Sequence, residues 1–367
     1  MILIDYLKEK LHDKRFLIAS KYIAEKENSL AENLKCKELS KEEIFLVKKT
    51  WKDVINNIET GINGFKLFRH LNGFDPEYIP FGYFFPWMVR ILSPIDAART
   101  FANKGMTYTY FHNIKQPELV VRKIHDCILD KNNNTINEDK IIACIKNAQE
   151  DVIVKQSLGS FCGKSIQIIH KGTSNEDISK ILKGYQGDYV IQKVLKQSVT
   201  TSRFNETSLN TFRIATLLLN GKFSVFASML RFGSPDSVVD NVSAGGACVG
   251  VQENGKLMPF GVTKNGEKIF EWNGLKFEDL EIPEYQKLVD AARKAHYDIP
   301  LCAFVGWDFA IDNQGEVNLI EANIESPGLL FLQLSNARPA FGERFNEVLE
   351  YVKSHPLPLL PLYDATN

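Results

Sequence analysis

The stretch VGWDFAIDNQGEVNLIEANIESPG, residues 305–328, decides the fold, because it predicts two short β-strands joined by an Asn-Gln-Gly turn. Side chains alternate between the two faces of a strand, so Trp307 and Asp308 point in opposite directions. Glu321 and Asn323 share one face of the second strand. If the strands pair across the turn, Asp308 faces both of them.

Such a pairing would gather two carboxylates and a carboxamide at one point of a half-buried sheet. Carboxylates placed in this way repel each other unless something positive lies between them. A small number of oxygen ligands suits Mg²⁺ that is held jointly with substrate phosphates. The alternative is a solvated sheet face with unrelated acids, and the hairpin alone leaves both interpretations open.

Composition excludes several classes of protein. Of 367 residues, 24% are charged and 44% apolar, and the formal net charge is −1, so neither nucleic acid nor an anionic membrane is an expected partner. The cysteines form no Cys-x-x-Cys pair, which predicts reduced thiols and a cytoplasmic location. The first residues are too charged for a signal peptide. The longest apolar stretch, residues 78–94, holds three prolines and an arginine, so we expect a buried segment and no stable membrane insertion.

The order of predicted elements indicates a helical region followed by two α+β units with mainly antiparallel sheets. Residues 41–58 carry an apolar stripe at helical spacing. In LLLNGKFSVF, Asn-Gly predicts a hairpin with a type I′ turn, and residues 251–270 repeat this device twice. We divide the chain into a helical N-terminal region (1–100), a lid or nucleotide-binding subdomain (101–195), a C-terminal catalytic subdomain (196–355) and a tail (356–367).

A glycine-rich loop follows a predicted strand in DVIVKQSLGSFCGKSI, residues 151–166. Lys155 lies at the end of that strand. Backbone N–H groups of residues 159–164 could form an anion-binding nest, to which a lysine side chain adds charge. The residues concerned are Gly159, Ser160, Gly163 and Lys164. The pattern is not that of a P-loop, and a plain hairpin is the alternative.

Two further stretches carry polar residues that could meet a ligand. In SLNTFRIAT, Arg213 lies within a strand without an obvious acid partner, which favours phosphate or carboxylate binding, with a structural ion pair as the alternative. In VVDNVSAGGACVG, Asp240 and Asn241 precede consecutive glycines, which let a backbone approach a ligand closely. A hairpin or a bulge explains the second stretch equally well.

Taken in this order, the motifs resemble the ATP-grasp superfamily, and most of all its sugar-transfer-associated branch, which is found with polysaccharide biosynthesis enzymes. The resemblance covers roughly residues 103–350 and rests on GWDFAIDNQGEVNLIEAN, NTFRIAT and VVDNVSAGG. It implies an α+β protein with the ATP-grasp fold, in which two α+β subdomains clasp ATP after a mainly helical N-terminal region.

The resemblance also implies roles for individual residues. Asp308, Glu321 and Asn323 would hold Mg²⁺ between the β- and γ-phosphates, while Arg213 and Arg231 would neutralise the transferring group. The remaining nucleotide contacts would come from Lys104, Lys155, the flap at residues 158–165, Asn241 and the adenine-contacting linker formed by Gln192, Lys193, Val194 and Leu195.

The activity that the resemblance implies is ATP-dependent ligation of a carboxylate to an amine through an acyl phosphate. Its substrates would be a small-molecule acid and an amine, either an amino acid or a sugar acid used in capsular or surface polysaccharide biosynthesis. A kinase of the same fold and a non-catalytic nucleotide-binding protein are the alternatives. Two positions depart from related ligases: Gly306 stands where they carry an arginine, and Lys193 stands where an acid is common.

Overall fold

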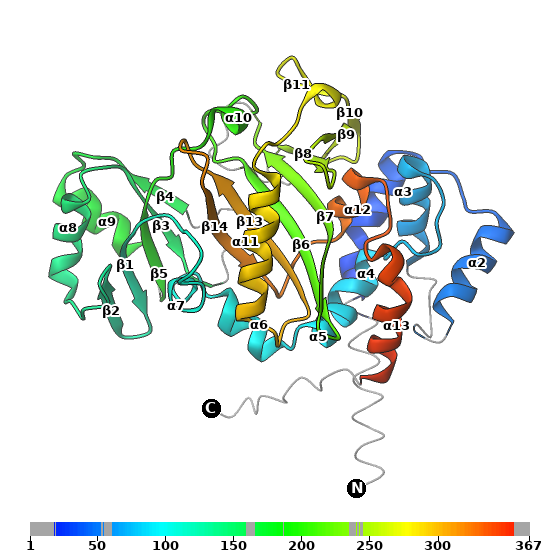
Figure 1. Cartoon of the computed structure of the whole chain (residues 1–367), viewed down its shortest axis with the longest axis horizontal. Coiled ribbons are helices and arrows are strands. Elements are labelled where there is room, and N and C mark those ends of the chain that lie inside the picture. Colours follow the sequence, from blue (N-terminus) through cyan, green and yellow to red (C-terminus); the bar gives the residue numbers. More distant parts are fainter. Residues whose placement is uncertain are drawn as a thin grey trace, which may run out of the picture.

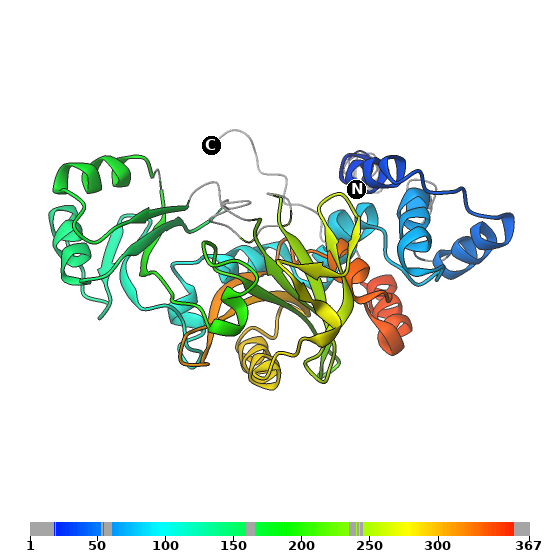
Figure 2. The ribbon, with the colours of Figure 1, turned by 90° about the horizontal axis from the view of Figure 1, so that it is seen from above.

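The computed structural model describes residues 18, 20–52, 54, 61–158, 166–185, 187–234, 240, 242 and 245–355. Three parts lie in a row (Figures 1 and 2). A five-stranded sheet with two helices forms one end, a seven-stranded sheet forms the middle, and the N-terminal helices form the other end. This arrangement is the mixed α+β architecture that the order of elements predicts.

The central sheet is antiparallel and has the strand order β10-β9-β8-β7-β6-β13-β14. Its strands are β6 (Thr211–Leu219), β7 (Lys222–Phe232), β8 (Ala247–Val251), β9 (Leu257–Thr263), β10 (Lys268–Ile269), β13 (Phe304–Ile311) and β14 (Val317–Asn323). A small ribbon of β11 (Glu271–Trp272) and β12 (Leu275–Lys276) follows β10. Helix α11 (Tyr285–Asp298) covers one face of the sheet and α12 (Leu330–Asn336) the other (Figure 1).

The predicted turn between β6 and β7 is confirmed, because Asn220 (φ 51°) and Gly221 (φ 73°) both have the positive φ of a type I′ turn. At the other two Asn-Gly pairs only the glycines, Gly255 (φ 84°) and Gly266 (φ 80°), have a positive φ. The hairpins are present there, but the expected type I′ turns are wrong. In these longer loops the asparagine keeps a negative φ, and only the glycine that follows it takes the left-handed conformation.

The five-stranded sheet has the order β2-β1-β5-β3-β4 and is also antiparallel. Its strands are β1 (Leu119–Ile124), β2 (Cys127–Asp130), β3 (Val152–Gln156), β4 (Ile166–Ile169) and β5 (Tyr189–Lys193). Helices α8 (Glu138–Asn147) and α9 (Asn175–Lys183) pack on it around a separate core that includes Val121, Val154 and Ile191. The short helix α7 (Thr107–Tyr110) precedes β1, and α10 (Val199–Ser202) lies in the connection from β5 to β6 of the central sheet (Figure 1).

The N-terminal helices pack against the C-terminal ones. The N-terminal helices concerned are α2 (Lys41–Trp51) and α3 (Ile62–Asn72), which meet α13 (Phe345–Ser354) and α12 respectively. Helix α6 (Ile95–Ala102) packs on β14 instead. The 3-10 turns are η4 (Phe277–Asp279) and η5 (Gly342–Arg344), the latter directly before α13. The apolar stripe predicted for residues 41–58 is buried at Val47 and Trp51, and the Trp51 and Phe345 rings meet edge to face at 5.6 Å. Ile55 and Ile58, the end of that stripe, and the tail 356–367 lie outside the described residues.

The apolar stretch 78–94 forms a buried, irregular helical segment, as expected. It consists of α4 (Phe81–Tyr83), the π-helix η2 (Phe84–Met88) and α5 (Val89–Leu92). Its buried side chains include Tyr83, Met88 and Leu92. Across the described parts of the chain, no helix combines the length and the apolar character needed to cross a bilayer. The described cysteines are all free thiols, and Cys162 lies outside the described residues.

Candidate functional site

The β13–β14 hairpin has the pairing that the sequence predicts. Asp308 lies directly opposite Glu321, and the Asn323 amide donates a hydrogen bond from Nδ2 to Asp308 Oδ2 at 3.1 Å. Both faces of β13 are covered, however, and Asp308 is only 3% exposed. The expected half-buried sheet and its alternative, a solvated face, are therefore wrong for this strand, because α11 covers one side and the chain after β14 closes the other.

Two arginines hold the Asp308 carboxylate. Arg213 lies opposite Asp308 on β6 and donates from both Nε and Nη2, the latter at 2.9 Å, while Arg231 of β7 donates to Oδ2 at 2.9 Å. Burial alone would raise the pKa of Asp308, but attraction to the two guanidinium groups lowers it below its ordinary value. The carboxylate is therefore ionised, and the ion pair considered for Arg213 is present.

The position of the Arg213 side chain explains why residue 306 is a glycine here, where related ligases carry an arginine. A Cβ atom at this position would lie 2.7 Å from the carbonyl oxygen of Pro327 and 3.1 Å from Cδ of Arg213. Arg213 Nη1 donates to that carbonyl at 2.7 Å, so its side chain lies across the glycine. No side chain fits at position 306, and the neighbouring strand β6 supplies a guanidinium group beside Asp308 instead.

Thr211 is a site residue that the sequence did not indicate, and Asp240, named there only as a polar neighbour of Asn241, joins it. Thr211 Oγ1 donates to Asp240 Oδ2 and accepts a hydrogen bond from Arg231 Nη2 at 2.6 Å, and Arg231 and Asp240 form an ion pair at 3.3 Å. Burial raises the pKa of Asp240, although the Arg231 charge opposes this shift. The available signal was position, since Thr211 lies two residues before Arg213 and Asp240 precedes Asn241.

Two lysines from outside the central sheet reach the same cluster. Lys104 forms an ion pair with Glu321 at 2.8 Å, and its backbone N–H donates to Ser157 just after β3 at 3.1 Å. Lys155 of β3 is buried, and its burial together with the positive charge of Lys104 lowers its pKa to about 8. The fold thus brings Lys104, Lys155 and Glu321 together from three distant parts of the chain.

The predicted adenine-contacting linker lies apart from these contacts. Gln192 and Lys193 end β5, and Val194 and Leu195 follow it. The backbone N–H groups of Lys193 and Val194 already donate to carbonyl groups at 2.9 Å, and the Lys193 ammonium group pairs with Glu118 at 2.8 Å. The amide of Gln192 is buried, and within the described residues its Oε1 has no hydrogen-bond partner. Of the four residues, Gln192 therefore has a polar atom free for a ligand.

Five sequence candidates cannot be placed. Gly159, Ser160, Gly163, Lys164 and Asn241 lie outside the described residues. Their assignment to nucleotide binding stays a prediction.

The donor set fits a hard divalent cation bound together with phosphates. Asp308, Glu321 and Asn323 offer only oxygen ligands, and cationic side chains hold both carboxylates, so the cluster already binds positive charge. Glu321 is the more accessible acid, with a side chain 30% exposed. Over the residues described here, no group of three or more His, Cys, Asp or Glu side chains is placed to hold a metal, so phosphate oxygens or water would have to complete the coordination.

Residues 90–348 match the model of a family described as sugar-transfer associated ATP-grasp. The chain belongs to this family. The match covers more than half of the sequence. It includes every member of the charge cluster, which consists of Lys104, Lys155, Thr211, Arg213, Arg231, Asp240, Asp308, Glu321 and Asn323. The ATP-grasp fold that the motifs imply is therefore confirmed, with the helical region preceding it.

Solved structures of ATP-grasp ligases resemble the chain at low identity. They include D-alanyl-alanine synthetase A from Vibrio cholerae O1 biovar eltor str. N16961 (13% identity, TM-score 0.42, 70% of this chain and 65% of that chain). N5-carboxyaminoimidazole synthetase from Staphylococcus aureus complexed with ADP matches at 11% identity and TM-score 0.40, over 70% of this chain and 52% of that chain. The ligase PsnB, complexed with a variant precursor, Mg and ADP, matches at 10% identity and TM-score 0.42, over 71% and 61%.

The chain spans less than two thirds of the length of these proteins. No curated protein matches it. Similarity at this level carries no information about the reaction, for which the charge cluster is the evidence.

Proposed function

We propose that the protein is a Mg-ATP-dependent carboxylate–amine ligase that forms an amide through an acyl phosphate. One observation supports this above all: Arg213, Arg231 and Lys104 converge on two adjacent carboxylates, Asp308 and Glu321. Phosphoryl transfer asks little covalent chemistry of a protein and depends on positioning and charge neutralisation. A buried cluster of cations and acids supplies both.

In the first step, an oxygen of the substrate carboxylate attacks the γ-phosphorus of ATP. The bond from that phosphorus to the bridging oxygen breaks, ADP leaves, and an acyl phosphate forms. Arg213 and Arg231 would neutralise the phosphoryl oxygens, and because they lie on adjacent strands they could act on the same group once a hydrogen bond to Asp308 is released. Lys104 and Lys155 would contact the other phosphates, and Gln192 the nucleotide base.

In the second step, the amine nitrogen attacks the acyl carbon. The bond from that carbon to the phosphate oxygen breaks, inorganic phosphate leaves with the electron pair, and the nitrogen passes a proton to the departing phosphate to give the amide. Arg213 would stabilise the charge that develops on the acyl oxygen, which is the task that related ligases give to an arginine at the position of Gly306. No side-chain nucleophile is required. The flap predicted at residues 158–165 would exclude water from the acyl phosphate.

Glu321, Asn323 and Asp308 would hold Mg²⁺. When bound, the ion supplies positive charge that offsets the charge of the terminal phosphates. Glu321 is the accessible ligand, whereas Asp308 would first have to release one of its guanidinium hydrogen bonds. Arg213 and Arg231 would then be free to turn to the phosphates, so the same side chains hold the site together before and after nucleotide binds.

The substrates belong to the proposal as well. We assign a small acid and an amine, drawn from amino acids and sugar acids, and a cytoplasmic reaction, which the free cysteines support. The role in surface polysaccharide biosynthesis rests on the sugar-transfer description of the family.

Hydroxylamine trapping tests the proposal. The protein is incubated with Mg-ATP, hydroxylamine and candidate amino or sugar acids, and both hydroxamate and ADP are measured. A ligase gives hydroxamate and ADP in equal amounts, and Glu321→Gln gives neither. A phosphorylated product that hydroxylamine does not consume would identify a kinase. Absence of Mg²⁺-dependent ATP binding in calorimetry would leave a non-catalytic protein and refute the proposal.

A further inference from the structure

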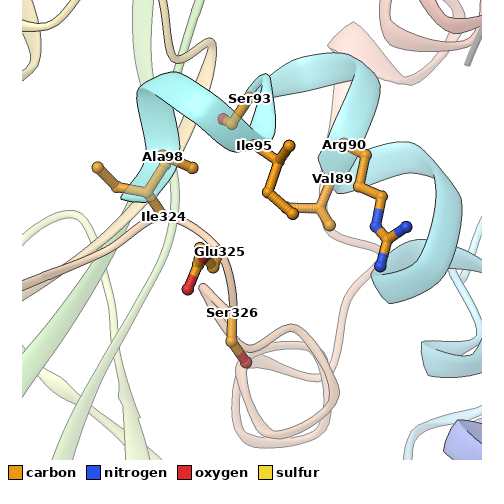
Figure 3. A pocket seen from close by; sticks show the side chains of 8 residues that line it. All are labelled: Val89, Arg90, Ser93, Ile95, Ala98, Ile324, Glu325 and Ser326. Carbon is orange, nitrogen blue, oxygen red and sulfur yellow. The ribbon is translucent and has the colours of Figure 1, made fainter. Parts of the chain in front are cut away.

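A pocket of about 170 Å³ lies between the helices α5 and α6 and the chain that follows β14 (Figure 3). Residues of the helices form one wall and Ile324, Glu325 and Ser326 form the other, around an open centre. The pocket is outside the charge cluster, and neither the motifs nor the family assign it a role.

The pocket adjoins the proposed reaction centre through the chain itself. Its residue Ile324 directly follows Asn323, and three residues later Arg213 holds the carbonyl group of Pro327 at 2.7 Å. The wall formed by residues 324–326 is therefore the chain segment between two contacts of the cluster, that of Asn323 with Asp308 and that of Pro327 with Arg213. A molecule in this pocket would therefore contact the segment that joins these two contacts.

The walls are mainly aliphatic. Val89, Ala98 and Ile324 are buried, Ile95 is partly exposed, and the hydroxyl group of Ser93 already donates to a backbone carbonyl group at 2.9 Å. A sugar placed here would leave several hydroxyl groups without partners, which is unfavourable in a desolvated site. An apolar group of a few carbon atoms suits the surface better.

Two charged side chains, Arg90 and Glu325, line the pocket. The Glu325 carboxylate accepts a hydrogen bond from Arg99 at 2.9 Å. Arg90 is half buried, and among the residues that the structure describes its guanidinium group has no hydrogen bond or ion pair, although it feels the charges of Arg99 and Glu325. A partly desolvated guanidinium group without a partner favours an anion, and carboxylates match its geometry best.

We propose that this pocket binds the amine substrate and that this substrate is a small α-amino acid with an apolar side chain. Its carboxylate lies on Arg90, its ammonium group lies towards Glu325, and its side chain packs against Ile95 and Ile324. That the bound amino acid is a substrate rests on the proposed ligase function. The binding itself does not, so the two can fail separately.

Titration calorimetry tests the binding, with and without Mg²⁺ and a non-hydrolysable ATP analogue. The ligands are glycine and the L- and D-forms of alanine, serine, valine and leucine, with glucosamine and glucuronic acid as competing classes. We expect Arg90→Ala to weaken amino-acid binding by about 10- to 100-fold, the usual range for a charge-assisted contact. The affinity of Arg90→Lys for the amino acid should lie between those of the wild type and Arg90→Ala. Ile95→Trp should fill the pocket and abolish binding.

Arg99→Ala is the matched control, because it removes the same charge nearby from a side chain that does not line the pocket. It should change the affinity by less than about fivefold, as expected of an exposed ion pair. Affinity for the ATP analogue should be equal in all variants. In turnover assays Arg90→Ala should raise KM for the amino acid and leave KM for ATP unchanged.

Three outcomes would overturn the inference. These are absence of amino-acid binding under both conditions, binding of the sugars instead, and equal effects of Arg90→Ala and Arg99→Ala. Amino-acid binding that depends on Arg90, in a protein that forms no hydroxamate, would refute the ligase function and leave the pocket assignment standing.

Discussion

The two ends of the β13–β14 hairpin each hold a buried aspartate, but they hold it in different ways. At the turn, Asp312 Oδ1 accepts hydrogen bonds from the backbone N–H groups of Gln314 (3.0 Å) and Glu316 (2.9 Å). Its other oxygen accepts from Asn318 at 2.9 Å and from Lys115 at 2.8 Å. Three of these four partners lie within six residues, so this carboxylate mainly fixes a turn.

At the other end, the partners of Asp308 are Arg213, Arg231 and Asn323, which come from three different strands. Backbone donors fixed by a turn cannot leave their acceptor. Long cationic side chains can exchange one anion for another at small cost in structure. The difference separates a structural acid from an acid that takes part in ligand binding, although the two lie within one stretch of five residues, 308–312.

The largest expected effect comes from Glu321, which lies opposite Asp308. Glu321→Gln should reduce turnover by about 1,000-fold or more, since it removes the accessible charged ligand for the metal. The midpoint of thermal unfolding without nucleotide should fall only slightly, because the Lys104–Glu321 ion pair is partly exposed and the new amide oxygen can still accept a hydrogen bond from Lys104. Coupled measurement of ADP release and differential scanning calorimetry check both statements.

The matched control for that variant is Asp312→Asn at the turn end. It should keep near-normal turnover and lower the unfolding midpoint. If Glu321→Gln were strongly destabilised without nucleotide, or if Asp312→Asn lost activity to the same extent, the contrast between the two ends would be wrong.

The next effect concerns stability at the site end. Asp308→Asn leaves Arg213 with no carboxylate partner and Arg231 with only Asp240, and breaking a buried pair of this kind destabilises by about 3 kcal/mol. Urea unfolding at pH 7 measures the loss. Added inorganic phosphate should restore part of the lost free energy of unfolding, because the anion can pair with the freed arginines. Phosphate should raise the free energy of unfolding of the wild type by less. Equal response to phosphate would show that the arginines do not exchange anions.

The smallest effect is the pH dependence of the turn end. Burial would raise the pKa of Asp312, but hydrogen bonds from Lys115, the backbone and Asn318 lower it to about 2. A lowered folded-state pKa contributes stability above the unfolded pKa, near 4, and this contribution is lost as the pH falls towards 2. The shift corresponds to about 2 kcal/mol. Urea unfolding between pH 5 and 2.5 should therefore fall more steeply for wild type than for Asp312→Asn, and parallel curves would contradict this.

Local patterns in the sequence determined the hairpin and much of the fold. Alternation and turn residues predict β13 and β14, and their pairing alone places Asp308 opposite Glu321, as the structure confirms. The Asn220–Gly221 turn was predicted down to its type. These features are readable because they depend on residues close in the chain, for which the backbone geometry is nearly fixed by residue type.

Turn type at Gly255 and Gly266 was not readable, because the same Asn-Gly pair serves loops of different length. Burial of both faces of β13 was not readable either, since the covering elements come from elsewhere in the chain. The roles of Thr211 and Asp240, the place of Arg213 across Gly306, and the meeting of Lys104 with Glu321 are contacts between residues far apart in sequence.

The sequence by itself determined that this chain has the ATP-grasp fold and which hairpin carries the acids. Only the tertiary structure decided which cations meet each acid, and that Arg90, unpaired within the described part of the chain, lines a pocket formed by the segment after β14. The physical reason is that strand and turn formation follow from local sterics and hydrogen bonds, whereas the partners of a buried charge are chosen by packing between distant segments.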